Sequence, residues 1–317
     1  MSGREIAVLA TGGTIAGTAS DASDTLGYTA AQLGIEQLLA SVPALKSVPL
    51  RSDQVAQIDS KDMSFQVWRE LALRCEHWLA QPQVAGLVIT HGTDTLEETA
   101  FFLHAVLAPT KPVVLTCAMR PATALAPDGP QNLVDAVMVA SHPEARGVVV
   151  VCDGTIHGAL DVSKQHTSRV DAFSSGDAGP IGYVEHGRLR LSREWPTPYR
   201  SSPFRLQQLP AHGQWPRVEI VMSHAGAGSA VVQALRAVGV DGLVAATTGN
   251  GTLHSELERA LLEAQGAGVR VVRATRCMRG GIVDLPGEPL PAAGALSPVK
   301  ARIGLLLQLI EQREQRA

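Results

Sequence analysis

Hydroxyl and carboxylate residues follow successive apolar runs of the sequence, and they are the residues whose types and spacing could do chemistry. Thr14 follows the first run, Ser60 the second, and Thr93 with Asp94 the third. A hydroxyl can attack a carbonyl carbon once a base removes its proton, and a carboxylate can hold a cationic group. Because ligands of open α/β sheets bind outside the carboxyl ends of the strands, this spacing predicts one polar site built from several loops.

A threonine nucleophile here needs a separate base, because Thr14 is internal and has no free amino group of its own. Lys164 is the candidate if folding brings it near Thr93. A lysine accepts a proton at neutral pH only where desolvation or a neighbouring cation favours its neutral form. The alternative is a solvated surface lysine, and the residues alone leave both interpretations open.

The same segments also have structural explanations. Asp94 with Glu97, and Thr95 with Glu98, fit the pattern of a capped helix N-terminus. The glycine pair at 12–13 fits a tight turn, and neither the dinucleotide-binding nor the P-loop glycine pattern is present there. Neither G-x-S-x-G nor H-E-x-x-H occurs, which argues against a standard serine hydrolase and a zincin.

Short β-branched runs alternate with amphipathic stretches, which predicts a parallel sheet with helices on both faces. We expect strands at 6–10, 48–58, 86–90, 113–116 and 147–151, and helices near 30–40, 64–80, 95–107 and 130–142. A β-hairpin is expected at 181–191. A second alternation predicts strands at 218–222, 242–246 and 269–274, and helices at 229–237, 254–265 and 298–314, the last capped by Ser297.

Prolines crowd the segment between these two alternations, which indicates an interdomain linker. The predicted fold class is therefore α/β, with a larger N-terminal parallel-sheet domain flanked by helices and a smaller C-terminal α/β domain. We expect the N-terminal domain at 1–194, carrying the catalytic threonines, the linker at 195–216 and the C-terminal domain at 217–317.

Composition narrows the class of protein. Of the 317 residues, 45% are hydrophobic and 18% charged, which excludes a disordered chain. Basic and acidic residues are interspersed and the net charge is −3, so no nucleic-acid or membrane-surface partner is expected. No apolar stretch reaches the ~18 residues of a membrane helix. The four cysteines form no CxxC pair, which favours a reducing, cytoplasmic compartment and gives no metal site.

The motifs resemble those of the bacterial L-asparaginase family, the type I and type II asparaginases that include glutaminase-asparaginases. ATGGTIAG at 10–17 and THGTDTLEETAFFL at 90–103 match its two signature segments. The resemblance extends over nearly the whole chain, through DSKDM at 59–63, AMRP at 118–121, DGPQNL at 128–133, DVSKQHT at 161–167, TGNGTL at 248–253 and SPVKAR at 297–302.

The resemblance implies an amidohydrolase that converts L-asparagine and water to L-aspartate and ammonia without a metal or organic cofactor. Thr14 corresponds to the nucleophilic threonine on a loop that closes over substrate, and Tyr28 to the tyrosine that polarises it. Thr93, Asp94 and Lys164 correspond to the second catalytic group. Which threonine forms the covalent bond stays open.

The resemblance also implies the substrate contacts. Asp94 holds the α-ammonium group, Ser60 and backbone near Asp59 hold the α-carboxylate, and Ala118 contributes backbone near the leaving amide. Asn250 reaches the site from a neighbouring subunit of a homotetramer, a dimer of dimers with sites at the dimer interface.

Two positions depart from the family pattern. Lys61 replaces the residues usual there, and is either solvent-facing or a contact of the substrate carboxylate. Glu288 is the candidate counterpart of an acid that crosses the subunit interface in other members of the family. Two further functions stay open: an asparaginase with substantial glutaminase activity, and a non-catalytic amino-acid-binding subunit.

Overall fold

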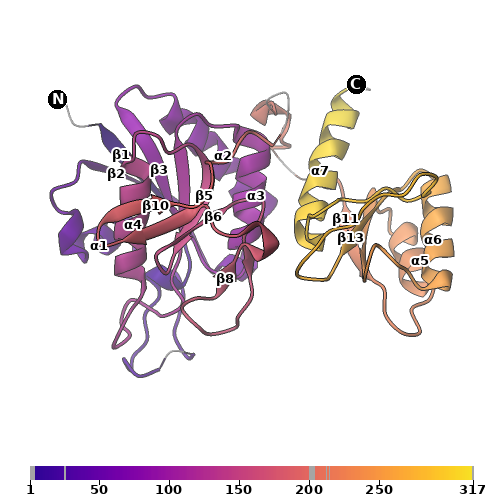
Figure 1. Cartoon of the computed structure of the whole chain (residues 1–317), viewed down its shortest axis with the longest axis horizontal. Coiled ribbons are helices and arrows are strands. Elements are labelled where there is room, and N and C mark those ends of the chain that lie inside the picture. The colour runs from indigo at the N-terminus through magenta and orange to yellow at the C-terminus, as the bar shows by residue number, and fades with distance from the viewer. Residues whose placement is uncertain (1–3, 25, 200–203, 212, 214, 316–317) are drawn as a thin grey trace. The chain divides into compact units, whose positions relative to one another are not determined.

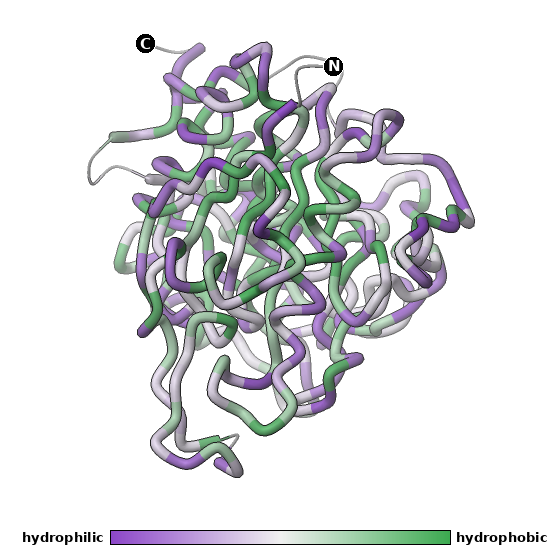
Figure 2. The backbone as a smooth tube through the Cα atoms, turned by 90° about the vertical axis from the view of Figure 1, so that its left-hand side faces the viewer, coloured by the Kyte–Doolittle hydropathy of each residue, from purple (hydrophilic) through white to green (hydrophobic). Residues whose placement is uncertain are grey.

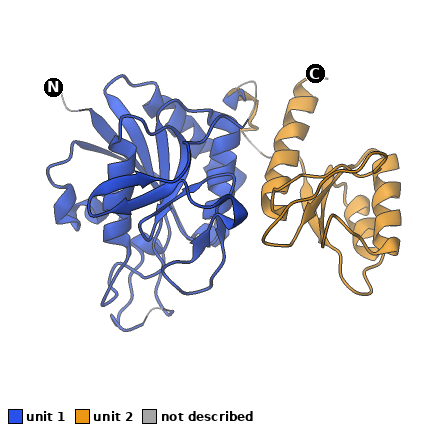
Figure 3. Ribbon diagram, viewed as in Figure 1, with its two compact units in different colours: residues 1–206 blue, residues 207–317 orange. Residues whose placement is uncertain are grey.

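The computed structural model describes residues 4–24, 26–199, 204–211, 213 and 215–315. It forms two compact units, residues 1–206 and residues 207–317 (Figure 3). Each unit is an α/β structure with its own main sheet, and the sheet of the first unit is the larger (Figure 1). The predicted fold class is therefore confirmed. The linker expected at 195–216 spans the division between the units, and its residues 200–203, 212 and 214 lie outside the described part.

Eight strands form the sheet of unit 1, in the order β10-β9-β6-β5-β4-β3-β1-β2. The five strands from β5 to β2 pair in parallel, whereas β6, β9 and β10 extend the sheet with antiparallel pairs. The sequence predicted the parallel part and the hairpin of β9 and β10, but not β6, which joins them. The bounds are β1 Glu5–Gly12, β2 Leu50–Ile58, β3 Val84–Thr90, β4 Pro112–Thr116, β5 Gly147–Cys152, β6 Thr155–Gly158, β9 Gly182–Glu185 and β10 Arg188–Leu191.

Helices cover both faces of the parallel strands (Figure 1). One face packs against α1 (Ile35–Ala40) and α4 (Gly129–Ser141), and the other against α2 (Phe65–Leu79) and α3 (Leu96–Leu107). Successive side chains of a strand point to opposite faces, so a strand covered on both sides must be apolar throughout. Val148–Val151 in β5 are fully buried for this reason. Figure 2 colours the chain by hydropathy, and green hydrophobic stretches alternate with purple hydrophilic ones along it.

Unit 2 contains a three-stranded parallel sheet in the order β11-β12-β13. Helices α5 and α6 pack against each other, and α7 packs against all three strands. Each element lies within one residue of its predicted bounds. They are β11 Val218–Met222, β12 Gly242–Thr247, β13 Arg270–Thr275, α5 Ala230–Ala237, α6 Ser255–Gly266 and α7 Pro298–Glu314.

One local prediction is wrong and another is confirmed in part. The first helix begins at Ile35 rather than near residue 30, because Ala31 has a left-handed backbone with a φ of 57° that a right-handed helix cannot contain. Ser297 precedes α7 as expected, but its hydroxyl makes no capping bond and has no hydrogen-bond partner among the described residues.

Candidate active site

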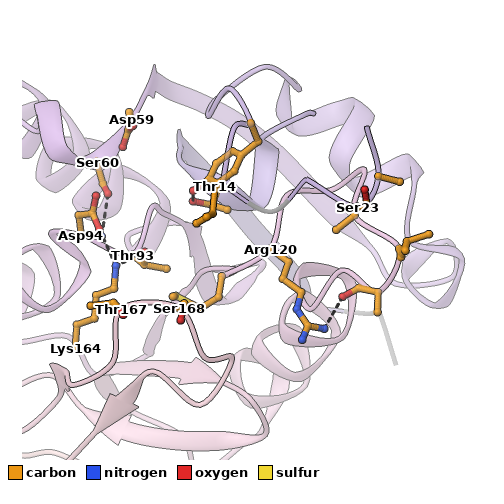
Figure 4. A pocket seen from close by; sticks show the side chains of 17 residues that line it. Thr14, Ser23, Asp59, Ser60, Thr93, Asp94, Arg120, Lys164, Thr167 and Ser168 are labelled. Carbon is orange, nitrogen blue, oxygen red and sulfur yellow. Dashed lines mark hydrogen bonds and ion pairs between the residues drawn. The ribbon is translucent and has the colours of Figure 1, made fainter. Parts of the chain in front are cut away.

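A cavity of about 640 Å³ opens in unit 1 at the carboxyl ends of β1, β2, β3 and β4 (Figure 4). This is the edge of the sheet at which the sequence analysis expects the site. The cavity is lined by most of the predicted residues, namely Thr14, Tyr28, Asp59, Ser60, Thr93, Asp94 and Lys164. It brings together residues that lie up to 150 positions apart in the sequence.

Glycines allow the two threonine loops to meet. Gly13 has a φ of 83°, and a Cβ atom added to it would lie 2.3 Å from the Cα atom of Gly92. A Cβ on Gly92 would in turn lie 2.4 Å from the Ser60 hydroxyl oxygen. No side chain fits in either place, so the loops after β1 and β3 touch backbone to backbone, and Thr14 and Thr93 line the same cavity.

Thr14 begins a 3₁₀ turn directly after β1 and is only 6% exposed. Its hydroxyl hydrogen-bonds the phenolic oxygen of Tyr28 at 2.7 Å. A β-bridge between Thr18 and Thr29 closes the loop that carries this tyrosine. The contact therefore holds the Thr14 hydroxyl oxygen next to the Tyr28 phenolic oxygen, whichever of the two donates.

Lys164 contacts both Thr93 and Asp94. Its Nζ atom donates to Thr93 Oγ1 at 2.9 Å and to Asp94 Oδ1 at 2.7 Å. The Thr93 side chain is nearly buried, whereas the Asp94 side chain is 51% exposed. Of the two interpretations of Lys164, the surface lysine is therefore excluded by geometry. The exposed Asp94 carboxylate is accessible to a cation that enters the cavity.

Ser60 connects the loop after β2 with the turn after β3. Its hydroxyl oxygen accepts the backbone N–H of Asp94 at 3.1 Å, and its carbonyl accepts the Thr95 hydroxyl at 2.8 Å. Ser60 Oγ keeps its own hydrogen, for which no acceptor is found in the described part of the chain. Thr95 is the N-cap residue of α3, as the capping pattern predicts, but its side chain makes no capping hydrogen bond.

Asp59 lines the cavity, whereas Lys61, two residues later, does not. Burial favours a higher pKa for the Asp59 carboxyl, but the hydrogen bonds and the charge of Lys61 outweigh it and lower this pKa below its ordinary value. Lys61 Nζ contacts Asp59 at 2.7 Å and Asp62 at 3.5 Å, and its side chain is 62% exposed. The structure thus agrees with the solvent-facing interpretation of Lys61.

A buried hydrogen-bond chain supports Gly92 and Thr93 from behind. His91 Nδ1 contacts the Gly92 carbonyl oxygen at 2.7 Å, and Nε2 contacts Thr99 Oγ1 at 2.9 Å. The carbonyl only accepts, so Nδ1 carries the proton and Nε2 accepts from the threonine, which itself accepts from Trp68 Nε1 at 2.8 Å. Burial lowers the pKa of His91 to about 4, against the opposing effect of the Gly92 carbonyl. The imidazole is therefore neutral at pH 7.

Helix α4 holds the loop after β4. The Asp128 carboxylate accepts the backbone N–H groups of Met119 and Arg120 at 2.8 and 2.9 Å. Asn132 donates to the Cys117 carbonyl at 3.0 Å. Ala118 is fully buried beneath this loop and does not line the cavity, whereas the two residues that follow it do.

The two predicted residues of unit 2 make contacts within that unit. The Asn250 side chain pairs with the backbone of Val283, accepting its N–H at 2.7 Å and donating to its carbonyl at 3.0 Å. Glu288 forms an ion pair with the buried Arg273 at 3.2 Å. Neither residue lines the cavity of unit 1.

Sequence reasoning missed part of the cavity wall. Met119, Arg120, Thr167 and Ser168 also line the cavity, as do exposed loop residues such as Leu26. The motifs at 118–121 and 161–167 contained three of these residues, so a signal was present. Within the described residues, no group of three or more His, Cys, Asp or Glu side chains could hold a metal ion.

Comparison with known proteins assigns the family. Residues 5–197 match the family "Asparaginase, N-terminal", and residues 217–317 match "Glutaminase/Asparaginase C-terminal domain". The chain belongs to the asparaginase family. It is 38% identical to L-asparaginase 2 of Escherichia coli, over 98% of this chain and 90% of that protein.

Other members of the asparaginase family resemble the chain to a similar degree. A probable periplasmic L-asparaginase of Haemophilus influenzae is 36% identical, over 98% of this chain and 89% of that protein. The crystal structure of a probable cytoplasmic L-asparaginase from Campylobacter jejuni superposes with a TM-score of 0.90 at 37% identity, over 96% of this chain and 94% of that one. The family resemblance inferred from the motifs is thus confirmed.

Proposed function

We propose that the protein hydrolyses the side-chain amide of L-asparagine to give L-aspartate and ammonia. The observation that carries this proposal is the contact of Lys164 Nζ with both Thr93 and Asp94 inside the cavity. It joins a candidate nucleophile, a candidate base and an anion for the substrate's ammonium group. Membership of the asparaginase family supports the same reaction.

The proposed reaction proceeds through a threonine ester. The hydroxyl oxygen of Thr14 or Thr93 bonds to the amide carbon, the C–N bond breaks, and ammonia leaves with the hydroxyl proton. Water then cleaves the ester, which releases aspartate and restores the threonine. Lys164 is the base in this scheme and must be neutral when it accepts the proton. Tyr28 orients the Thr14 hydroxyl through their 2.7 Å hydrogen bond.

The zwitterionic end of asparagine needs an anion and a hydrogen-bond donor. Asp94 offers an exposed carboxylate for the α-ammonium group. Ser60 offers its hydroxyl hydrogen for the α-carboxylate, because its oxygen is already oriented by the Asp94 N–H. Backbone near Asp59, and backbone beside Ala118, where Met119 lines the cavity, completes the proposed contacts. Charge-assisted hydrogen bonds of this kind are about twice as strong as neutral ones.

Ammonia release by the purified protein tests this function. We expect turnover of L-asparagine that exceeds turnover of L-glutamine, whose longer side chain displaces the amide from the threonines. Comparable rates for both would identify a glutaminase-asparaginase. No ammonia from either, with binding of asparagine retained, would identify a non-catalytic amino-acid-binding protein and contradict the proposal.

We also propose a homotetramer, a dimer of dimers, in which Asn250 reaches the cavity of a neighbouring subunit. The side chain is held rigidly by Val283, which suits a residue presented to another chain. Light scattering should report four chains per particle at assay concentration. An active monomer would contradict this assembly.

A cytoplasmic location is proposed as well. All four cysteines are free, and three of them are buried, as in proteins of a reducing compartment. The described residues contain no helix long and apolar enough to cross a membrane. Cell fractionation should recover the protein with cytoplasmic markers, and recovery with periplasmic markers would contradict this location.

A further inference from the structure

Lys164 lies on a structural element that has little support of its own. Its strand, β7 (Ser163–Lys164), pairs only with β8 (Phe173–Ser174), and this two-stranded ribbon is separate from the eight-stranded sheet. Two-stranded ribbons are at best marginally stable in water without other packing. The position of the Lys164 ammonium group therefore depends on contacts that tie the ribbon to the rest of unit 1.

Glu97 makes such a contact. Its Oε2 atom accepts the backbone N–H of Lys164 at 2.9 Å. Glu97 lies in the first turn of α3, three residues after Asp94 and two after the N-cap residue Thr95. The sequence pattern had suggested that Glu97 caps the helix by accepting the Asp94 N–H. That N–H is taken by Ser60 instead, and the Glu97 carboxylate contacts the ribbon.

Lys164 is thus held at both ends by one short stretch of chain. Its ammonium group donates to Thr93 and Asp94, and its backbone N–H donates to Glu97. We propose that Glu97 is a positioning residue that sets the distance between Lys164 and the Thr93 hydroxyl. The predicted effect on catalysis rests on the proposed function. The hydrogen bond between Glu97 and Lys164 is independent of it.

The expected kinetic effect falls on the chemical step. Displacement of a catalytic group by about 1 Å can cost roughly 100-fold in rate. We expect Glu97→Ala to lower kcat by about 10- to 100-fold and to change KM by less than about threefold, because Asp94 and Ser60 still hold the substrate. Glu97→Gln keeps an oxygen that accepts the Lys164 N–H, so it should retain kcat within about threefold of wild type. Glu36→Ala removes an exposed first-turn glutamate of α1 and serves as the matched control.

Amide hydrogen exchange provides a readout that does not depend on turnover. The Lys164 amide should exchange faster in Glu97→Ala than in wild type, and at the wild-type rate in Glu97→Gln and Glu36→Ala. Unchanged exchange in a folded Glu97→Ala protein, or equal losses of kcat in the alanine and glutamine variants, would overturn the positioning role. Wild-type protein that releases no ammonia would instead overturn the proposed function, while the exchange result would still test the contact.

Discussion

Replacement of His91 by glutamine should remove most of the dependence of stability on pH between about 6.5 and 4. The neutral imidazole is fully buried, and burial lowers its pKa from 6.5 to about 4. Between these values the unfolded chain binds a proton that the folded chain does not, so stability falls as the pH decreases. One pKa unit corresponds to about 1.36 kcal/mol, which gives roughly 3 kcal/mol over the whole interval.

Urea denaturation at pH 7.5 and pH 4.5, at one protein concentration, measures this effect. The free energy of unfolding of the wild type should fall by about 2 to 3 kcal/mol more than that of His91→Gln over this range. Thr99→Val is the control, because it breaks the same hydrogen-bond chain but keeps the titrating ring. It should lose stability at pH 7.5 and retain most of the pH dependence. Parallel curves for wild type and His91→Gln would refute the linkage of His91 titration to stability.

Three further substitutions test residues of the loops that form the cavity. Tyr28→Phe removes the hydrogen bond to Thr14 and should lower kcat by about 100-fold with little change in melting temperature; a wild-type kcat would contradict the role of Tyr28. Gly13→Ala forces a Cβ atom to within 2.3 Å of Gly92 and should lower the melting temperature and abolish turnover, whereas an active, equally stable variant would exclude this close approach. Lys61→Gln removes an exposed charge, so steady-state kinetics should show KM for asparagine and glutamine changed by less than about threefold; a larger change would assign Lys61 to substrate binding.

Many elements of the fold could be predicted because the pattern of apolar residues in the sequence indicates which faces are buried. β5 is apolar along its whole length because helices cover both faces of the sheet, and Val148–Val151 carry that signal. The alternation of apolar runs and amphipathic stretches in unit 2 predicted the bounds of each helix and strand to within one residue. Strand β6 was missed because its four residues are too few to show a period and include a histidine. The start of α1 was misjudged because the left-handed conformation of Ala31 leaves no mark on residue type.

The residues of the candidate site could be predicted from the sequence, but the hydrogen bonds between them could not. The carboxyl-end rule and the motifs identified Thr14, Ser60, Thr93 and Asp94 from sequence. They could not show whether Glu97 caps the helix or accepts a hydrogen bond from a distant backbone N–H, because a glutamate three residues after Asp94 is compatible with both roles. The contact of Lys164 with that turn spans about 70 positions and arises only in the folded chain.

Ammonia release by Thr14→Ala, Thr93→Ala and the double variant tests the central claim most directly. Both hydroxyls line one cavity, and each is hydrogen-bonded to a different residue, Tyr28 or Lys164. Each single variant should lose nearly all turnover of asparagine with an unchanged circular dichroism spectrum. The double variant should be little worse than either, because residues that act as a unit are not additive. A wild-type rate in either single variant would contradict a site in which both threonines are required.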